Sequence, residues 1–202
     1  MAVQYLISSI LGYLMGCIQS AYLIGRMAGK LDIRDHGSGN AGASNITSTL
    51  GIKYGVVVGL VDILKGFLAV QFTLWIYPGV LDLALLAGLM AVVGHIFPFF
   101  MGFRGGKGVA TLAGVMFGVD WKLGILFVLL VAVPALATDY IVAGSFTTFL
   151  ALPIVTYLRG YPIYFTLWGI ALAALCFYLH RGNIRRILAG EELKISSVIK
   201  WK

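Results

Sequence analysis

Charged residues are scarce in this sequence, and long polar stretches are almost missing. Only 11% of the 202 residues are charged and 60% are hydrophobic, with a mean hydropathy of +0.95. A soluble domain is about 25% charged and about 45–50% apolar. The composition therefore excludes a soluble globular protein. It predicts an integral membrane protein with a single membrane domain over residues 1–202.

The sequence also contains few cysteine and carboxylate residues. Cys17 and Cys176 both lie inside apolar runs, so we interpret them as small buried hydrophobes and not as a disulfide or a metal pair. The sequence has 8 Asp and Glu residues in all, and Glu191 and Glu192 are the one close pair expected to face the cytosol. Motifs for zinc hydrolysis, for a Gly-x-Ser-x-Gly nucleophile and for dinucleotide binding are absent. We therefore expect neither a metal ion nor a cofactor.

Basic residues are present in excess and give a formal net charge of +7. They cluster beside apolar runs and form no Arg/Lys tract with interleaved aromatic residues in a polar setting. We therefore expect them to set the membrane topology and to bind anionic headgroups or phosphates, and we expect no nucleic acid as a partner.

The apolar runs supply seven candidate spans, each compared with the roughly 20 residues that a membrane helix needs. They cover residues 3–25, 54–77, 80–103, 109–119, 123–138, 141–158 and 163–179. The run 109–119 is short, about 17 Å at about 1.5 Å per residue, and Asp120 and Lys122 interrupt the sequence after it. The prediction is an all-α bundle of seven transmembrane helices, with five spans plus a re-entrant hairpin as the alternative.

The basic residues are distributed unequally over the two sides of such a bundle. Seven spans place Lys122 and Arg159 on one side. The other side receives Arg26, Lys30, Arg34, Lys53, Arg104, Lys107, Arg181, Arg185, Arg186, Lys194, Lys200 and Lys202. By the positive-inside rule the N-terminus lies outside and the C-terminus in the cytoplasm. The five-span alternative gives the same placement.

The stretch 94–111 contains the most informative pattern in the chain. Here an apolar run ends and is followed by Arg104, Gly105, Gly106, Lys107 and Gly108. Glycines allow backbone N–H groups to approach a phosphate closely, and the two cations add charge and directed donors. The spacing differs from that of a P-loop. Two interpretations fit equally well: an oxyanion site at the membrane surface, or glycines that allow close helix packing with cations that anchor a helix end.

Two further polar segments are expected on the same face. The segment 37–45 alternates glycines with small polar side chains, among them Ser38, Asn40 and Asn45. It suits a phosphate or a polyhydroxyl ligand, although Ser38 or Asn45 could also cap the following helix. In the third segment His180, Asn183 and Arg186 are spaced to share one face of a helix. His180 is a possible general base, and the alternative is a basic tail that only sets topology.

Several polar residues inside the apolar runs have structural explanations. Asp62 and Lys65 are three residues apart in surroundings that penalise a single charge, so we expect them to pair in the bundle interior. His95 is expected to be a satisfied structural donor at a helix end. Ser145 and Thr147 are expected to form hydrogen bonds within helices.

Three segments of this sequence resemble the motifs of the PlsY family, the bacterial acyl-phosphate-dependent glycerol-3-phosphate acyltransferases. They are Gly-Ser-Gly-Asn-Ala-Gly-Ala-Ser-Asn at 37–45, the stretch from Gly-His-Ile-Phe-Pro to Gly-Gly-Lys-Gly-Val-Ala-Thr at 94–111, and His-x-x-Asn-x-x-Arg-Ile-x-x-Gly-x-Glu at 180–192. The resemblance implies a seven-helix fold in the bacterial cytoplasmic (inner) membrane with its site open to the cytosol. It implies transfer of a fatty acyl group from acyl phosphate to the 1-hydroxyl of sn-glycerol 3-phosphate, which gives lysophosphatidic acid and phosphate at the start of phospholipid synthesis.

The resemblance also implies roles for individual residues. It assigns Lys107, His180 and Asn183 to catalysis. It assigns substrate binding to Ser38, Gly39, Asn40, Asn45, Arg104, Gly105, Gly106, Gly108, Ser145, Arg186 and Glu192. Membrane lipids and a functional link to the soluble acyl-phosphate synthase are implied as well. One position departs from the family pattern, because Ser48 stands where family members commonly carry Arg, so Arg34 or Arg104 would have to substitute.

The mechanism and a rival function follow from these expectations. Acyl phosphate is already activated, so the protein needs no nucleophile of its own. The hydroxyl proton would go to His180 or to a phosphate oxygen of the donor, and we favour the phosphate oxygen because no acid that would orient His180 is evident. The rival function is a small membrane transporter or binding protein for an anionic phosphorylated solute. The sequence has no internal repeat of the kind that transporters often show.

Overall fold

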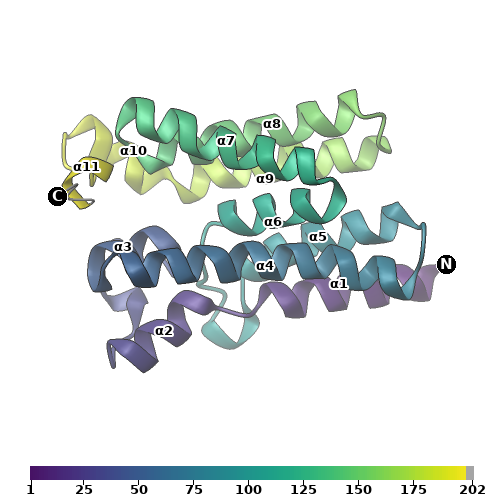
Figure 1. Ribbon diagram of the computed structural model, residues 1–202, viewed down its shortest axis with the longest axis horizontal. Coiled ribbons are helices and arrows are strands. Elements are labelled where there is room, and N and C mark those ends of the chain that lie inside the picture. The colour runs from purple at the N-terminus through teal and green to yellow at the C-terminus, as the bar shows by residue number, and fades with distance from the viewer. Residues whose placement is uncertain (199–202) are drawn as a thin grey trace. The chain divides into compact units, whose positions relative to one another are not determined.

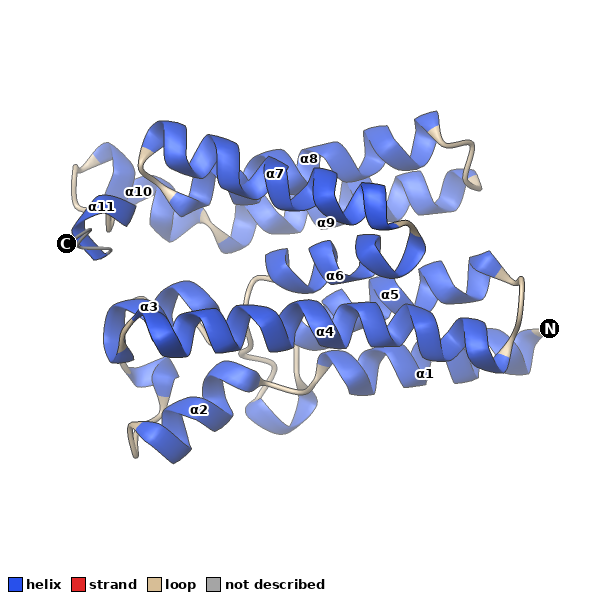
Figure 2. Cartoon of the chain, viewed as in Figure 1, coloured by secondary structure: helices blue, strands red, loops and turns tan. Residues whose placement is uncertain are grey.

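The computed structural model describes residues 1–198, and every regular element in this range is a helix (Figure 2). This confirms the all-α prediction. The chain forms two compact units, Met1–Ile125 and a second one that begins at Leu126. The prediction of a single domain over residues 1–202 remains a prediction. Lys200 and Lys202, which we expect on the cytoplasmic side, lie outside the described residues.

The first unit is a bundle of long helices with shorter ones at one end. Its elements are α1 (Ala2–Gly16), α2 (Ser20–Ala28), η1 (Ile33–Asp35), α3 (Ala43–Leu50), α4 (Ile52–Ile76), α5 (Leu81–Ile96), η2 (Phe99–Met101), α6 (Val109–Val119) and the start of α7 (Trp121–Thr138). In Figure 1, α1, α4, α5 and α6 run side by side, and α2 and α3 lie at one end of them.

Small residues bring these helices together, as is common where lipid replaces water around a bundle. A Cβ added to Gly12 or Gly16 of α1 would lie 2.0 Å from the carbonyl oxygen of Ala87 or Ala91 on α5. On α6, a Cβ at Gly114 would lie 1.9 Å from the Ile63 carbonyl oxygen of α4. Backbone therefore packs directly on backbone at both helix pairs.

The first predicted span, 3–25, is broken into two helices. α1 ends at Gly16 and α2 starts at Ser20, and Gln19 between them has non-helical backbone angles. A break at this depth requires protein partners for the exposed carbonyl groups. The side chains of Gln19 and Lys65 supply them, by donating to the carbonyls of Gly16 and Ile18.

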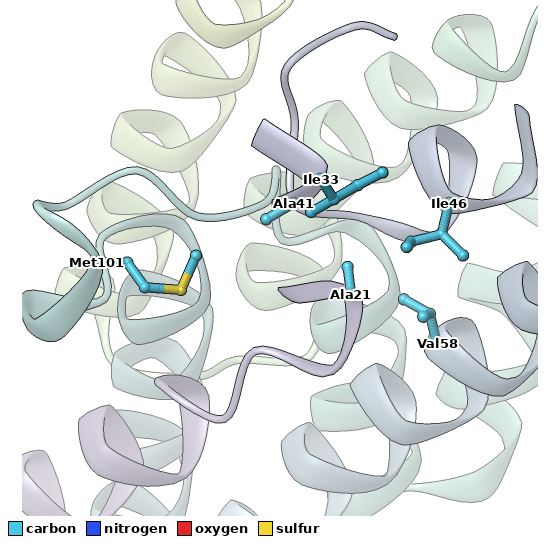
Figure 3. Close-up of a cluster of buried hydrophobic side chains, with 6 residues drawn as sticks. All are labelled: Ala21, Ile33, Ala41, Ile46, Val58 and Met101. Carbon is cyan, nitrogen blue, oxygen red and sulfur yellow. The ribbon is translucent and has the colours of Figure 1, made fainter. Parts of the chain in front are cut away.

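A helix, α3, also lies in the polar region between the first two predicted spans, where the sequence predicts none. The polar composition of α3 hides its one well-buried apolar residue, Ile46, which packs into a hydrophobic cluster (Figure 3). The cluster consists of Ala21, Ile33, Ala41, Ile46, Val58 and Met101. These residues come from α2, η1, the loop before α3, α3, α4 and η2. Tertiary packing thus decides the structure of a segment whose composition is typical of a loop.

The second unit contains most of α7 and the helices that follow it. These are α8 (Ile141–Leu158), α9 (Ile163–Leu179), α10 (Arg181–Leu188) and α11 (Ile195–Val198). α8 packs closely on both neighbours: a Cβ at Gly144 would lie 2.1 Å from the Val131 carbonyl oxygen of α7, and Pro153 lies against Gly169 of α9. The predicted runs 141–158 and 163–179 match α8 and α9.

The helices identify a polytopic membrane protein. Within residues 1–198, five segments are long and apolar enough to cross a bilayer: Ala2–Ala28, Ile52–Ile76, Leu81–Met101, Trp121–Thr138 and Ile141–Leu158. A sixth results if α9 and α10, bent by 48°, are taken together. α6 is apolar but has only 11 residues.

Candidate functional site

The first polar loop is shaped by the side chain of Asn45, which is 2% exposed. Its Nδ2 donates to the carbonyls of Ile33, His36 and Asn40 at 2.9–3.0 Å, and its Oδ1 accepts from the backbone N–H of Ser38 at 2.9 Å. Asn45 is therefore not the helix cap that the sequence allowed, since Gly42 is the N-cap of α3. Its polar atoms are occupied by the loop, so Asn45 shapes the loop backbone, and its expected contact with substrate remains a prediction.

The other polar residues of this loop are more exposed than Asn45. Ser38 and Gly39 are exposed and Asn40 is half-buried. Within residues 1–198 the Ser38 hydroxyl forms no hydrogen bond. The Asn45 contacts therefore fix the backbone of the loop and leave the Ser38 hydroxyl at the surface.

The second loop, residues 104–108, is seated on the end of α5. The N–H of Gly105 donates to the Ile96 carbonyl at 3.1 Å, and the N–H of Gly106 donates to the His95 carbonyl at 3.0 Å. Gly108 has φ +81, a left-handed conformation that favours glycine, and it begins α6. The amides of Gly105 and Gly106 are thus used inside the protein, and the loop instead presents its cations and the first turn of α6.

The structure brings these two loops together. The N–H of Ala41 donates to the Gly105 carbonyl at 3.4 Å, and Arg34 Nη1 donates to the Met101 carbonyl at 2.8 Å. Ala41 and Met101 also share the hydrophobic cluster of Figure 3. Segments about 60 residues apart in the sequence thereby form one polar end of the first unit.

Two cations of the second loop stand at the start of α6. Arg104 is exposed and forms no ion pair with any residue in the range 1–198, and Lys107 is half-buried. The N-terminus of a helix also carries partial positive charge and N–H groups without partners in the helix. This end of α6 can therefore hold an anion such as a phosphate.

Arg34 is occupied elsewhere, which bears on its expected role as a substitute at Ser48. Its guanidinium bonds both carboxylate oxygens of Asp32, with Nη2–Oδ2 at 2.7 Å and Nε–Oδ1 at 3.0 Å. The hydrogen bonds from Arg34 lower the pKa of Asp32 to about 2, and Asp32 in turn raises the pKa of Arg34. Arg26 completes the cluster at 3.1 Å from Asp32. Arg34 is therefore a structural residue, and Arg104 remains the candidate.

The third motif lies in the second unit, around the junction of α9 and α10. His180 is 2% exposed, and its Nδ1 lies 2.8 Å from the Cys176 carbonyl. Because a carbonyl only accepts, Nδ1 carries the proton, and in a neutral imidazole the lone pair is then on Nε2. Phe146 packs edge-on against the His180 ring, with the two ring centroids 5.4 Å apart. The ring is thus held in the tautomer that a base acting through Nε2 requires.

Glu192 joins two further residues of this motif. Its Oε1 accepts from Asn183 Nδ2 at 2.6 Å, and its Oε2 accepts from Arg186 Nε at 2.7 Å. Asn183 and Arg186 therefore share one face of α10, as their spacing predicts. Ser145 donates to the Ile141 carbonyl at 3.4 Å within α8, and Thr147 bonds within α8 and to Leu130 of α7. The expected intrahelical bonds are confirmed, and Thr147 adds one between helices.

Some important residues carry a signal that sequence reasoning did not use. Asp32 was counted only as one of few acids, although an acid two residues before Arg34 can form a local ion pair. Cys176 precedes His180 by one helical turn, so its carbonyl was a foreseeable acceptor. Gln19, a lone amide in an apolar run, was a foreseeable mark of a break in the span.

The fold and these motifs define a class: a polytopic membrane protein with a cationic, glycine-containing loop at one end of a helical bundle, a candidate site for an anion. The family described as glycerol-3-phosphate acyltransferase matches residues 6–190. A glycerol-3-phosphate acyltransferase of Oceanobacillus iheyensis is 37% identical, over 98% of each chain. One of Syntrophomonas wolfei is 41% identical, over 93% of this chain and 95% of the relative. The chain belongs to the glycerol-3-phosphate acyltransferase family, which confirms the resemblance to PlsY.

Two solved structures are also similar to this chain. The crystal structure of PlsY, an integral membrane glycerol 3-phosphate acyltransferase, in its glycerol 3-phosphate form is 35% identical with a TM-score of 0.86, and covers 98% of this chain and 99% of its own. The lysophosphatidic acid form is 36% identical with a TM-score of 0.80, over 94% of each chain. The prediction of an acyltransferase of phospholipid synthesis is confirmed by this membership.

Proposed function

We propose that this chain transfers a fatty acyl group from acyl phosphate to the 1-hydroxyl of sn-glycerol 3-phosphate, and that lysophosphatidic acid and phosphate are the products. The observation that carries the proposal is the junction of the first two loops, where Ser38, Arg104 and Lys107 stand at one polar end of the first unit. Family membership supplies the acceptor and the product. The resemblance to the PlsY family implies acyl phosphate as the donor, and a site rich in cations and poor in nucleophiles suits such an activated substrate.

The reaction brings two anions together, and the proposed site supplies charge for both. Lys107 and Arg104 would hold phosphate oxygens, and the first turn of α6 would add N–H donors. The Ser38 hydroxyl would bind the glycerol phosphate. Holding both reactants in place can lower the barrier by roughly 7–11 kcal/mol. Cations at the departing phosphate stabilise the charge that develops on it in the transition state.

The hydroxyl proton has two possible acceptors. The acyl phosphate itself can accept it on a phosphate oxygen, and His180 can accept it on Nε2. The hydrogen bond from Nδ1 to the Cys176 carbonyl holds His180 in the tautomer that a base needs. The deep burial of the ring speaks for a supporting role, so we favour the phosphate oxygen. Asn183 and Arg186, both bonded to Glu192, would then orient substrate groups.

We propose that Arg104 takes the place of the Arg that Ser48 lacks. Arg34 is tied to Asp32 and to the Met101 carbonyl, whereas Arg104 is exposed beside Gly105. Arg104→Gln should raise the KM for glycerol 3-phosphate by roughly ten- to a hundred-fold, since hydrogen bonds to charged groups contribute about 1.5–3 kcal/mol. Arg34→Gln should act mainly by lowering the melting temperature.

We further propose seven spans in the bacterial cytoplasmic (inner) membrane, with the N-terminus outside, the C-terminus inside and the acceptor site open to the cytosol. The excess of Lys and Arg on one side supports this orientation. A cytosolic site would receive acyl phosphate from a soluble acyl-phosphate synthase and glycerol 3-phosphate from solution.

The activity is tested with purified protein in detergent, radiolabelled glycerol 3-phosphate and synthetic acyl phosphate. We expect lysophosphatidic acid to form, and we expect Lys107→Ala to reduce kcat/KM by at least roughly a hundred-fold. Lys53→Ala is the matched control, because it removes an exposed Lys from the first turn of α4. Solute uptake into vesicles with no lysophosphatidic acid in detergent would instead support the rival function of a transporter.

A further inference from the structure

A buried polar cluster fills the break between α1 and α2. Its members are Gln19, Ser20, Asp62, Lys65 and His95, and each is at most 4% exposed. They come from α2 and the residue before it, from α4 and from α5. None of them belongs to the groups that we propose to touch substrate. Buried charge at membrane depth is costly, so its presence requires an explanation.

Lys65 is the centre of the buried polar cluster. Its Nζ lies 2.9 Å from Asp62 Oδ1, 2.6 Å from the Ile18 carbonyl and 2.7 Å from His95 Nδ1. An ammonium group has three N–H donors, so these three acceptors use all of them. Ser20 Oγ also donates to Asp62 Oδ1 at 2.9 Å. The expected pair of Asp62 and Lys65 is thereby confirmed, and it is extended to His95.

His95 connects the buried polar cluster to the loop 104–108. Because Nδ1 accepts from Lys65, the proton of the neutral ring is on Nε2. A Cβ added to Gly106 would lie 2.0 Å from Nε2, so the ring lies directly against this glycine. The His95 carbonyl accepts from the N–H of Gly106 at 3.0 Å and from Gln19 Nε2 at 3.0 Å. Side chain and backbone of His95 therefore both support the loop.

We infer that the buried polar cluster positions the loop 104–108 for phosphate binding, with Lys65 and His95 as positioning residues that do not touch substrate. The inference rests on the proposed role of Lys107 and Arg104. If the cluster served only to pair the carbonyl groups exposed by the break, the bond from Lys65 to the Ile18 carbonyl and the ion pair of Lys65 with Asp62 would be enough. The contact of His95 with Gly106 goes beyond that need. A displacement of about 1 Å in a bound group can cost about a hundred-fold in rate.

The test separates positioning from stability by means of a charge-matched pair of variants. Lys65→Met leaves Asp62 as a buried, unpaired charge, and should lower both stability and loop order. The double variant Asp62→Asn/Lys65→Met removes both charges, so its melting temperature should lie well above that of Lys65→Met. It still lacks the hydrogen bond from Lys65 to His95. Thr73→Val is the control, since Thr73 is a buried polar residue of α4 whose hydroxyl bonds only the Ala69 carbonyl.

We expect the KM for glycerol 3-phosphate to rise roughly ten- to a hundred-fold in Lys65→Met and to stay raised in the double variant, with a smaller change in kcat. Thr73→Val should keep the normal KM. A KM that returns to normal together with the melting temperature, or a KM unchanged in both variants, would overturn the inference. If Lys65→Met cannot be purified, Gln19→Met serves instead, because it removes a donor to the His95 carbonyl without leaving a charge unpaired.

Lys107→Ala, measured in the same assay, distinguishes the two levels of the proposal. If Lys107→Ala raises the KM and the charge-matched variants do not, the positioning role alone is wrong. If Lys107→Ala leaves both kcat and KM unchanged, the loop does not act on the substrate phosphates, and the proposed site and the positioning role are both wrong.

Discussion

Asn45 illustrates how much one buried amide can determine. It satisfies three carbonyl groups and one N–H group of a loop that has little regular structure of its own. A buried polar group that loses its partner costs about 1–3 kcal/mol. The conformation of the whole loop 37–45 therefore depends on this side chain.

Replacement of Asn45 should affect both folding and substrate binding. We expect Asn45→Ala to reduce the stability by at least about 2 kcal/mol, because it leaves several buried groups unpaired, and to raise the KM for glycerol 3-phosphate. Ser48→Ala, on the same helix, loses one bond to the Asn45 carbonyl and should have a small effect. Thermal unfolding in detergent and steady-state kinetics provide the measurements. Equal melting temperatures for the two variants would contradict this account.

Asp32 should make the stability of the first unit depend on acid. Its pKa in the folded protein is about 2, below the ordinary value of 3.8, because of the hydrogen bonds from Arg34. A lowered pKa means that the carboxylate stabilises the fold above pH 4 and that this contribution is lost as the pH falls from about 4 to about 2. The difference in melting temperature between the wild type and Asp32→Asn should be largest near pH 7 and should shrink over that range. A difference that is constant from pH 7 to pH 2 would be inconsistent with the ion pair.

At the scale of residues, the sequence predicted charge pairing better than amide function. Asp62 and Lys65 were predicted to pair because an apolar run penalises either charge alone. This argument does not depend on the exact residues at which the helix begins and ends. The role of Asn45 depends on where α3 begins. With Gly42 as the N-cap, Asn45 lies inside the helix, and its side chain reaches back to the loop. The structural role of Asn45 was missed for lack of that one boundary, and its expected contact with substrate remains a prediction.

At the scale of elements, the contact between α4 and α6 depends on glycine. A Cβ at Gly66 would lie 2.2 Å from the Thr111 carbonyl oxygen, whereas a Cβ at Gly59, on the same helix, would meet only Ala43 Cβ at 3.9 Å.

Gly66→Ala should therefore lower the melting temperature strongly, while Gly59→Ala should change it little. Overpacking of this kind typically costs about 1–3 kcal/mol. Thermal unfolding of the two variants in the same detergent tests this. A Gly66→Ala protein as stable as Gly59→Ala would contradict the close approach of the two helices.

The short helix α11 is fastened to the turn between α7 and α8. The Asp139 carbonyl accepts from the N–H of Ile195 at 2.9 Å, and its carboxylate accepts from the N–H and the hydroxyl of Ser196 at 2.8 and 2.6 Å. These bonds lower the pKa of Asp139. The segment between α10 and α11 contains Glu192, so the attachment restricts the motion of the residue that holds Asn183 and Arg186.

Loss of this attachment should loosen the end of the chain without unfolding the helices. We expect faster amide hydrogen exchange over residues 191–198 in Asp139→Asn and in Ser196→Ala. Ser197→Ala is the control, because among the described residues the Ser197 hydroxyl bonds the nearby Lys194 carbonyl and no other group. Exchange that is equally fast in the control would indicate that Asp139 has no particular role.

The sequence predicted most apolar helices well, and it predicted the polar helix α3 and the break in the first span poorly. The runs 109–119, 141–158 and 163–179 coincide with α6, α8 and α9, because an apolar run in a membrane protein has few alternatives to a helix. α3 was missed because its polar side chains bond locally, and its helix is stabilised by the packing of Ile46. The break after α1 was missed because the Gln19 signal was not used, and because the Lys65 bond to Ile18 that supports the break joins segments 47 residues apart.

At the scale of the whole molecule, the orientation and the number of spans can be tested together. In a Cys17→Ala/Cys176→Ala background, a membrane-impermeant maleimide applied to intact cells should label Lys122→Cys if there are seven spans. It should fail to do so if residues 109–138 form a re-entrant hairpin. Arg159→Cys should be labelled from outside in both cases, and Lys53→Cys in neither. Labelling of Lys53→Cys in sealed cells would reverse the proposed orientation.

The attachment of the broken first span to the loop 104–108 has a consequence for the lipid around the protein. The His95 carbonyl accepts hydrogen bonds from Gln19, in the break after α1, and from the N–H of Gly106 in the loop 104–108. A shift of the first span along the bilayer normal should therefore move that loop. Lipids that are too short or too long for the hydrophobic length of a helix impose tilt or displacement on it. We therefore expect bilayer thickness to affect substrate affinity, so that nanodiscs made from lipids of graded chain length should show an optimum in the KM for glycerol 3-phosphate.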